Sequence, residues 1–309
     1  MSNSYPKKLS NKILCGHGVT RCVAFNQDGN YCMTGGSDNR IILWNPISGT
    51  NLKTYCGHAG EITEIVSTAD NAHIASGSDD KMVMLWDVTT GISINRWRRH
   101  LGRVNTIALN DESNVVLSGG IDKHVYVWDR RSKSINPIQS LNEARDSVIS
   151  VDSHKWFILT ASLDETLRVY DLRKGQLCED FIGKMPTSVK LATDCHLILV
   201  NCSDNILRLF DYENGSLLQK FSGHKNDDYR IGCSFIKGNS HVISGSVGNS
   251  VHIWNLLNAQ CEKKLEVPLI KSSSRVSTNV VHSIAAHPSK SDVLLAAAGD
   301  HVFLYNDDE

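Results

Sequence analysis

Hydroxyl, imidazole and carboxylate side chains recur together in the first half of the sequence. The three sets comprise His17, Thr34 and Asp38; His58, Ser76 and Asp80; and His100, Ser118 and Asp122. These residue types can activate a hydroxyl oxygen as a nucleophile when the imidazole takes its proton, a third group orients the imidazole, and an oxyanion hole lies beside the oxygen. The chemistry that they could perform is therefore nucleophilic catalysis.

The spacing of the three sets favours a structural role instead. Each aspartate is followed six residues later by a tryptophan, at Trp44, Trp86 and Trp128. The hydroxyl, carboxylate and indole positions repeat every 42 residues, and the histidines repeat at intervals of 41 and 42. A pattern that recurs with a fixed period marks the packing of a repeated unit. We therefore expect one buried network per repeat, in which the carboxylate accepts from the imidazole and the hydroxyl links the imidazole to the indole N–H. No catalytic residue, cofactor or metal site is predicted, and the chain is not expected to be an enzyme.

Short strands must position these networks. Residues 76–87 are predicted to form two strands around a tight turn, because Gly77 lies among small and polar residues while Val83 and Leu85 alternate with their neighbours at strand period. The aromatic residue near the end of this hairpin recurs at intervals of 40 to 51 residues. The seven aromatic markers are Trp44, Trp86, Trp128, Tyr170, Phe210, Trp254 and Tyr305.

A repeat of about 40 to 45 residues with Gly-His near its start and Trp-Asp near its end is the signature of a WD40 β-propeller blade. The markers therefore predict an all-β, seven-bladed propeller that forms a single domain over residues 1–309. The last blade has only three strands, and an open ring would leave strand edges unpaired. We expect residues 11–15 to pair with residues 302–305 and close the ring, after an N-terminal tail of residues 1–10.

The later blades depart from the pattern. Blades four and five lack the front histidine but keep Asp164 and Asp204, so we expect an incomplete network and a less rigid arc. The interval of 51 places an insertion at residues 267–279, which are rich in serine and threonine. This insertion is either a tolerated surface loop or a docking segment that can be phosphorylated at residues 272–278.

Composition narrows the classes of function. The net charge of −1 gives no general attraction to nucleic acid or to an anionic membrane. The nine cysteines are odd in number and include no C-x-x-C pair, and neither a signal-peptide-like start nor an apolar run near 18 residues is present. We expect reduced thiols, no membrane span and a location in cytoplasm or nucleus.

One mouth of the predicted ring is the candidate binding surface. Residues at the entry to each inner strand and beside each turn aspartate should face this mouth, and arginine, tyrosine and apolar side chains are typical of binding hot spots. Ile121 and Leu163 are expected to be exposed on adjacent blades. The candidate partner-binding residues are Arg21, Glu61, Arg103, Asn105, Ile121, Arg145, Asp146, Leu163, Tyr229 and Arg230.

Two basic stretches, residues 96–103 and 130–133, raise the alternative of RNA binding. Arginine beside an aromatic residue can hold a phosphate and stack a base. However, Trp97 falls on a predicted outer strand, where packing between sheets is expected, and the total charge is near zero. We therefore expect RNA contact to be indirect.

A further alternative comes from the ends of blades three and four. Trp128-Asp129-Arg130-Arg131 and Tyr170-Asp171-Leu172-Arg173 resemble the box by which some propellers dock onto the cullin-4 ligase adaptor. The alternative function is therefore a substrate receptor of a cullin-4 ubiquitin ligase.

Several segments also resemble one family of propellers more specifically. They are residues 25–32, 43–50, 141–148, 171–177 and 223–229, of which Glu-Ala-Arg-Asp at 143–146 and Gly-His-Lys-Asn at 223–226 are unusual for a blade. These segments are similar to the mitogen-activated protein kinase organizer family (WD repeat-containing protein 83 type).

The resemblance implies a non-catalytic scaffold in cytoplasm and nucleus. Its expected partners are components of a mitogen-activated protein kinase cascade, spliceosomal proteins in pre-mRNA splicing, and a prolyl hydroxylase. We expect a monomer within larger complexes, with no membrane attachment. No binding residue is transferred from the family.

Overall fold

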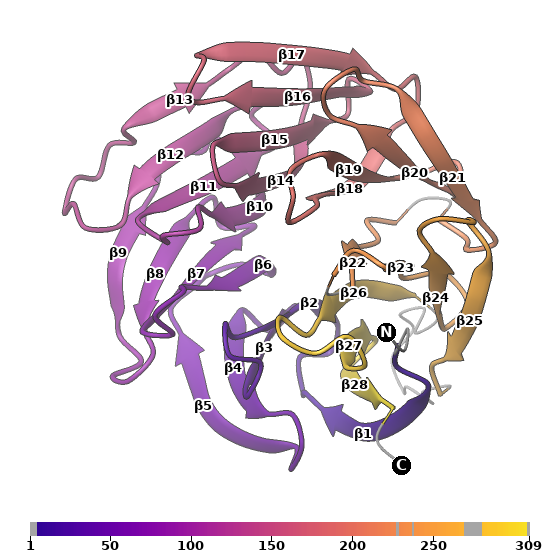
Figure 1. The fold of residues 1–309 in the computed structure, drawn as a ribbon. Helices are drawn as coiled ribbons and strands as arrows, with labels where there is room; N and C mark the ends of the chain where they lie inside the picture. Colours follow the sequence, from indigo (N-terminus) through magenta and orange to yellow (C-terminus); the bar gives the residue numbers. More distant parts are fainter. Residues whose placement is uncertain (1–4, 227–228, 237, 269–279, 308–309) are drawn as a thin grey trace.

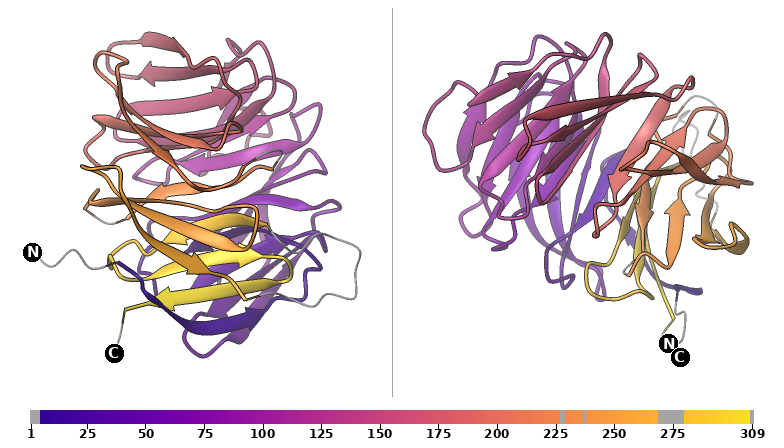
Figure 2. Two further views of the ribbon diagram at one scale, coloured as in Figure 1. Left: turned by 90° about the vertical axis from the view of Figure 1, so that its right-hand side faces the viewer. Right: turned by 45° about the horizontal axis from the view of Figure 1, so that its top comes forward.

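The computed structural model describes residues 5–226, 229–236, 238–268 and 280–307. These residues contain 28 strands and no helix, and the strands form seven four-stranded antiparallel sheets. Each sheet is one blade of a ring, seen face-on in Figure 1 and from two further sides in Figure 2. The predicted seven-bladed, all-β propeller is confirmed.

The first four blades each use four consecutive strands. Blade one comprises β2 (Thr20–Phe25), β3 (Cys32–Gly36), β4 (Arg40–Asn45) and β5 (Thr50–Cys56). Blade two comprises β6 (Ile62–Ser67), β7 (His73–Ser78), β8 (Val83–Asp87) and β9 (Ser93–Trp97). Blade three comprises β10 (Val104–Leu109), β11 (Val115–Gly120), β12 (Val125–Asp129) and β13 (Gln139–Leu141). Blade four comprises β14 (Val148–His154), β15 (Phe157–Ser162), β16 (Thr166–Asp171) and β17 (Gln176–Phe181).

The last three blades include the one that joins the two ends of the chain. Blade five comprises β18 (Pro186–Leu191), β19 (Leu197–Cys202), β20 (Ile206–Asp211) and β21 (Leu217–Ser222). Blade six comprises β22 (Cys233–Phe235), β23 (His241–Ser244), β24 (Ser250–Asn255) and β25 (Cys261–Glu266). Blade seven comprises β26 (Val281–Ala286), β27 (Leu294–Ala298), β28 (His301–Asn306) and β1 (Lys8–Leu14).

The seven innermost strands contact one another in a closed circle. The order around the circle is β2, β6, β10, β14, β18, β22, β26 and back to β2. One cluster of buried apolar side chains fills each of the seven spaces between neighbouring blades. In the space between blades one and two, for example, Tyr55 packs with Ile62 and Trp86. Strand alternation therefore supplies each sheet with two apolar faces, and the ring buries both.

Strand β1 closes the ring beside β28, as the sequence predicts. Ile13 pairs with Val302, and Lys12 with Phe303. The closing strand is longer than expected, because Lys8 pairs with Asn306 and Leu9 with Tyr305. The prediction of a tail over residues 1–10 is thus corrected: residues 8–10 are strand, since β28 continues to Asn306 and its edge would otherwise be unpaired.

The predicted insertion at residues 267–279 also needs a correction at its start. Val267 is buried against blades six and seven, and its N–H donates to the Asn249 carbonyl at 2.8 Å. Burial of this valine removes apolar surface from water, which holds the segment to the core. The remainder of the predicted insertion from residue 269, including the phosphorylation prediction at 272–278, lies outside the described residues.

Candidate interaction surface

In blades one to three the predicted side chains meet in one network per blade. In blade two, His58 Nε2 lies 2.8 Å from Ser76 Oγ, and the Trp86 indole N–H donates to the same oxygen at 2.8 Å. His58 Nδ1 lies 2.8 Å from an oxygen of Asp80. Every polar group is satisfied when Nδ1–H donates to the carboxylate and the serine hydroxyl donates to Nε2.

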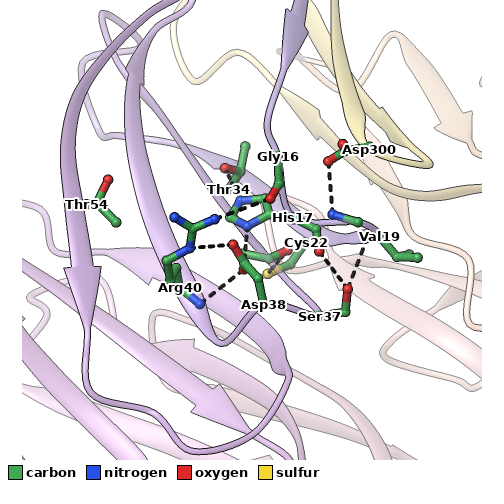
Figure 3. Close-up of polar contacts among 12 residues, drawn as sticks. Gly16, His17, Val19, Cys22, Thr34, Ser37, Asp38, Arg40, Thr54 and Asp300 are labelled. Carbon is green, nitrogen blue, oxygen red and sulfur yellow. Dashed lines mark hydrogen bonds and ion pairs between the residues drawn. The ribbon is translucent and has the colours of Figure 1, made fainter. Parts of the chain in front are cut away.

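Blades one and three repeat this geometry. In blade one, His17 bridges Asp38 at 2.6 Å and Thr34 at 2.8 Å, and Trp44 donates to the Thr34 hydroxyl at 2.8 Å. Arg40 adds a further ion pair to Asp38 at 2.6 Å (Figure 3). In blade three the corresponding residues are His100, Ser118, Asp122 and Trp128, with distances of 2.8 to 3.1 Å.

These hydroxyl groups have no access to a substrate. Thr34, Ser76 and Ser118 are fully buried. Each hydroxyl oxygen already accepts an indole N–H and is hydrogen-bonded to an imidazole nitrogen. Burial alone would raise the pKa of Asp80, but the hydrogen bond and charge of His58 lower it below its usual value. The arrangement holds the blade together and does not present a nucleophile.

Blades four and five use arginine where the earlier blades use histidine. Arg168 is 1% exposed and forms ion pairs with Asp164 at 2.9 Å and with Glu179 at 2.7 Å. In blade five Arg208 pairs with Asp204 across two N–H···O contacts. Burial raises the pKa of Asp164, but hydrogen bonds from Arg168 and Ser162 outweigh this and hold the pKa at about 2.

The prediction that the network is incomplete in blades four and five is therefore wrong, because a different side chain completes it. A guanidinium on the third strand replaces the imidazole, and Tyr170, in the place of the tryptophan, donates to Glu143 at 2.9 Å. The sequence signal was an arginine four residues after each turn aspartate, at Arg168 and Arg208, which the first three blades lack.

Blade six shows a third arrangement. His224 Nε2 lies 3.0 Å from the side-chain oxygen of Asn201, whose amide donates to Ser244 Oγ at 3.0 Å. Gly248 stands where the first five blades have aspartate, and His224 Nδ1 has no hydrogen-bond partner in the described part of the chain. Burial, helped by the nearby His252, lowers the pKa of His224 to about 4.

The mouth predicted to bind partners carries the turn between the second and third strand of each blade and the connections between blades. We call this side of the ring the entry face. Ile121, Arg145, Asp146 and Tyr229 are exposed on it. Arg21, Glu61, Arg103, Leu163 and Arg230 are half-buried. Leu163, which was expected to be exposed, is therefore only partly exposed.

Asn105 does not belong to this surface. It is buried, and its amide group donates to Ser147 Oγ at 3.0 Å and to the Val148 carbonyl at 2.8 Å. These bonds join blade three to blade four, because Asn105 lies on the inner strand β10 against β14. Its predicted role in partner binding is therefore corrected to a link between blades.

The half-buried arginines are held by carboxylates around the central channel. Arg21 pairs with Glu61 at 2.9 Å. Arg230 crosses the channel from blade six, pairing with Glu64 of blade two at 2.9 Å and donating to the Asn105 carbonyl. A cavity of about 440 Å³ lies in the channel. Arg230 therefore links opposite sides of the ring.

The channel also holds charged residues that the sequence analysis missed. Lys190 pairs with Asp152 at 3.1 Å, and this carboxylate raises the pKa of the lysine. Burial and the charge of Arg21 lower the pKa of His282 to about 4. The sequence signal that could have identified them was a charged residue inside an inner strand, as in β14 and β18. Such a charged side chain does not fit the apolar space on either side of its blade.

The side chains of the two basic stretches differ in how exposed they are. Trp97 is buried and stacks on Trp128, with ring centroids 5.3 Å apart, so the predicted packing between blades is confirmed. Arg130 pairs with Asp70 at 3.2 Å. The arginines of the two cullin-box sequences, Arg131 and Arg173, have side chains that are 71% and 53% exposed.

All nine cysteines are free thiols. Within the part of the chain that the structure describes, no helix could cross a membrane. Six of the thiols are buried. Burial raises the pKa of Cys15 to about 12, the largest cause being loss of solvent around the thiolate.

Comparisons with known proteins agree with this architecture. The family model "WD domain, G-beta repeat" matches residues 8–45, 49–87, 91–129 and 215–255. The chain is 48% identical to WD repeat domain-containing protein 83 of Rattus norvegicus, covering 95% of this chain and 90% of the relative. It is 51% identical to the Xenopus tropicalis protein of that name, covering 95% and 91%, and 29% identical to the Dictyostelium discoideum homolog, covering 97% and 98%.

The alignments to these three relatives cover 95 to 97% of this chain. Proteins with this fold are typically binding platforms, and none of the relatives carries the name of an enzyme. The chain belongs to the WD40 repeat proteins and, within them, to the WD repeat domain-containing protein 83 family.

Proposed function

We propose that this protein is a non-catalytic scaffold that holds several partner proteins on one rigid ring. The partners are components of a mitogen-activated protein kinase cascade, spliceosomal proteins acting in pre-mRNA splicing, or both, together with a prolyl hydroxylase. Holding partners on one body raises their effective concentration without any new contact between them. The resemblance to the kinase organizer family supports these classes of partner and a location in cytoplasm and nucleus.

The observation that carries the proposal is a fixed apolar and basic patch on the entry face. Ile121 is 54% exposed, and its side chain lies against Gly102, where any Cβ would clash with it. Next to it, the Lys123 ammonium group donates to the Arg145 carbonyl at 2.8 Å, which ties the turn of blade three to the entry of blade four. An exposed isoleucine beside arginine on a rigid surface fits a protein-binding hot spot.

The test compares two variants of the full chain by affinity purification and mass spectrometry from nuclear and cytosolic fractions. Ile121→Asp combined with Arg145→Glu removes the apolar contact and reverses the charge. We expect recovery of kinase-cascade or spliceosomal partners to fall about ten-fold or more. Leu257→Asp, in the exposed turn between β24 and β25 on the opposite face, is the matched control.

Two results would contradict the proposal. Equal recovery of the same partners with the entry-face variant and with wild type would move the binding site elsewhere. Turnover of a small-molecule substrate by the purified chain would overturn the non-catalytic assignment.

A second candidate function is that of a cullin-4 substrate receptor. The observation that favours it is the exposure of Arg131 and Arg173 at equivalent positions of adjacent blades. We expect Arg131→Ala combined with Arg173→Ala to abolish binding to the ligase adaptor in a pull-down with purified proteins. Adaptor binding that survives both changes discards this candidate.

A further inference from the structure

Blade three has an irregular outer edge. Its outer strand β13 has three residues and pairs only with Val125–Val127. The connection before it spans residues 130–138, whereas the corresponding connections of blades one, two, four, five and six have four or five residues. Figure 1 shows this longer connection projecting from the rim beside β9.

Blade two holds this connection in place. The Asn95 amide group lies 3.3 Å from the carbonyl oxygens of Arg130 and Ser132, and the Trp97 indole N–H donates to the Ser134 carbonyl at 3.1 Å. The connection therefore leans across the gap between the blades and has a fixed shape. A groove of about 450 Å³ lies between it and β9, which we call the rim groove. Its volume falls within the range of about 300–1,000 Å³ typical of ligand sites.

The rim groove has an uncompensated positive charge. Its lining includes Arg96, Arg130, Arg131 and Lys133 and contains no carboxylate. Arg130 pairs with Asp70, and Arg131 lies 3.5 Å from Asp129. Within the described residues, neither Arg96 nor Lys133 forms an ion pair. A negatively charged occupant would therefore meet cations that the ring itself leaves unpaired.

Apolar side chains flank these cations. Ile94 lines the groove from β9 and Ile135 lines it from the connection, and Ile135 is 74% exposed. Exposed isoleucine on both walls of one groove indicates contact with an apolar group, because such surface gains free energy when it leaves water.

We propose that the rim groove binds an extended acidic segment of a partner protein that carries at least one large apolar side chain. The carboxylates contact Arg96, Arg131 and Lys133, and the apolar side chain packs between Ile94 and Ile135. This site is separate from the entry face, so the ring would hold two partners at once. RNA fits less well, because Trp97 is buried against Trp128 and its N–H is occupied, which leaves no aromatic surface for a base.

The experiment measures fluorescence anisotropy of purified full-length protein with three labelled probes. The first is a peptide of alternating leucine and aspartate, the second has lysine in place of aspartate, and the third is single-stranded oligouridine. We expect saturable binding of the first peptide only. Arg131→Glu combined with Lys133→Glu should weaken this binding about ten-fold or more, because like charges then face the peptide.

Arg173→Glu combined with Lys174→Glu is the matched control. These residues follow Asp171 as Arg131 follows Asp129, but they lie in the short connection of blade four. We expect the control to bind the acidic peptide as wild type does, while Ile94→Asp weakens binding without disturbing the near-ultraviolet circular dichroism of the tryptophans. Equal binding of the two peptides, an equal loss in the control, or binding of oligouridine alone would overturn the proposal.

Discussion

Blades one to three and blades four and five hold the same turn aspartate with different side chains. In blade two, Asp80 accepts the N–H groups of Ala59 and Met82 at 2.8 and 2.9 Å. In blade four, Asp164 accepts those of Arg145 and Thr166 at 2.8 and 3.1 Å. The backbone task of the carboxylate is thus the same, and only its side-chain partner changes from imidazole to guanidinium.

The comparison indicates that the turn carboxylate is needed in all five of these blades, whereas its side-chain partner can vary. A chain of imidazole, hydroxyl and indole satisfies this carboxylate in one arc of the ring. A buried cation satisfies it in the other arc and also reaches Glu179 on the outer strand. The two arcs should therefore respond differently to the loss of one partner and to pH.

The largest expected effect is in blade four. Arg168→Ala leaves the largely covered Asp164 carboxylate, whose side chain is 10% exposed, without its cation, so we expect the free energy of unfolding to fall by about 3–5 kcal/mol. Urea unfolding followed by intrinsic fluorescence measures this. Arg173→Ala, on an exposed side chain of the same blade, is the control, and equal losses for the two variants would show that burial does not matter here.

The corresponding change in blade two should cost less. Ser76→Ala leaves His58 Nε2 and the Trp86 indole N–H without their shared partner, at about 1–3 kcal/mol for a buried group left unpaired. The same unfolding experiment tests it, with the exposed Ser222→Ala as control. A loss as large as that of Arg168→Ala would erase the distinction between the two arcs.

The pH dependence of stability separates blade six from both arcs. Because the pKa of His224 is about 4 in the folded protein and about 6.5 when unfolded, the unfolded state takes up the proton first and stability falls as the pH drops from about 6.5 to about 4. Asp38, Asp80 and Asp122 have lowered pKa values, so their contributions are lost only below about pH 4.

We therefore expect His224→Gln to reduce the loss of stability between pH 7 and pH 5 by about 2 kcal/mol. Unfolding curves at the two pH values measure it. His196→Gln, on an exposed histidine, should leave the loss unchanged. An unaltered loss in the His224 variant would mean that this histidine does not titrate in the expected range.

The smallest effect is expected at the half-buried pair of Arg21 and Glu61. Their side chains are 35% and 20% exposed, so Glu61→Gln should change the free energy of unfolding by at most about 1 kcal/mol. Added salt should reduce even this difference. A larger change would indicate that the pair acts within the channel network, like the buried pairs of blade four.

Some features of the site followed from residues close together in the sequence. The turn aspartate of the first five blades and the aromatic residue six positions later belong to one hairpin, so their spacing alone indicates the blade. The histidine of blades one to three lies 21 or 22 residues before the aspartate, and its network could be predicted for that reason. The expectation for Asn105 failed because burial against the neighbouring blade depends on how the blades pack.

The sequence by itself determined the all-β class, the seven blades and the closing strand, because strand period, turn residues and repeat length are local properties of the chain. Only the tertiary structure decided that Arg230 crosses the channel to Glu64, 166 residues away, and that the connection of blade three leans onto blade two. Such contacts depend on where ring closure places segments that are distant in the sequence, and the spacing of neighbouring residues does not determine those positions.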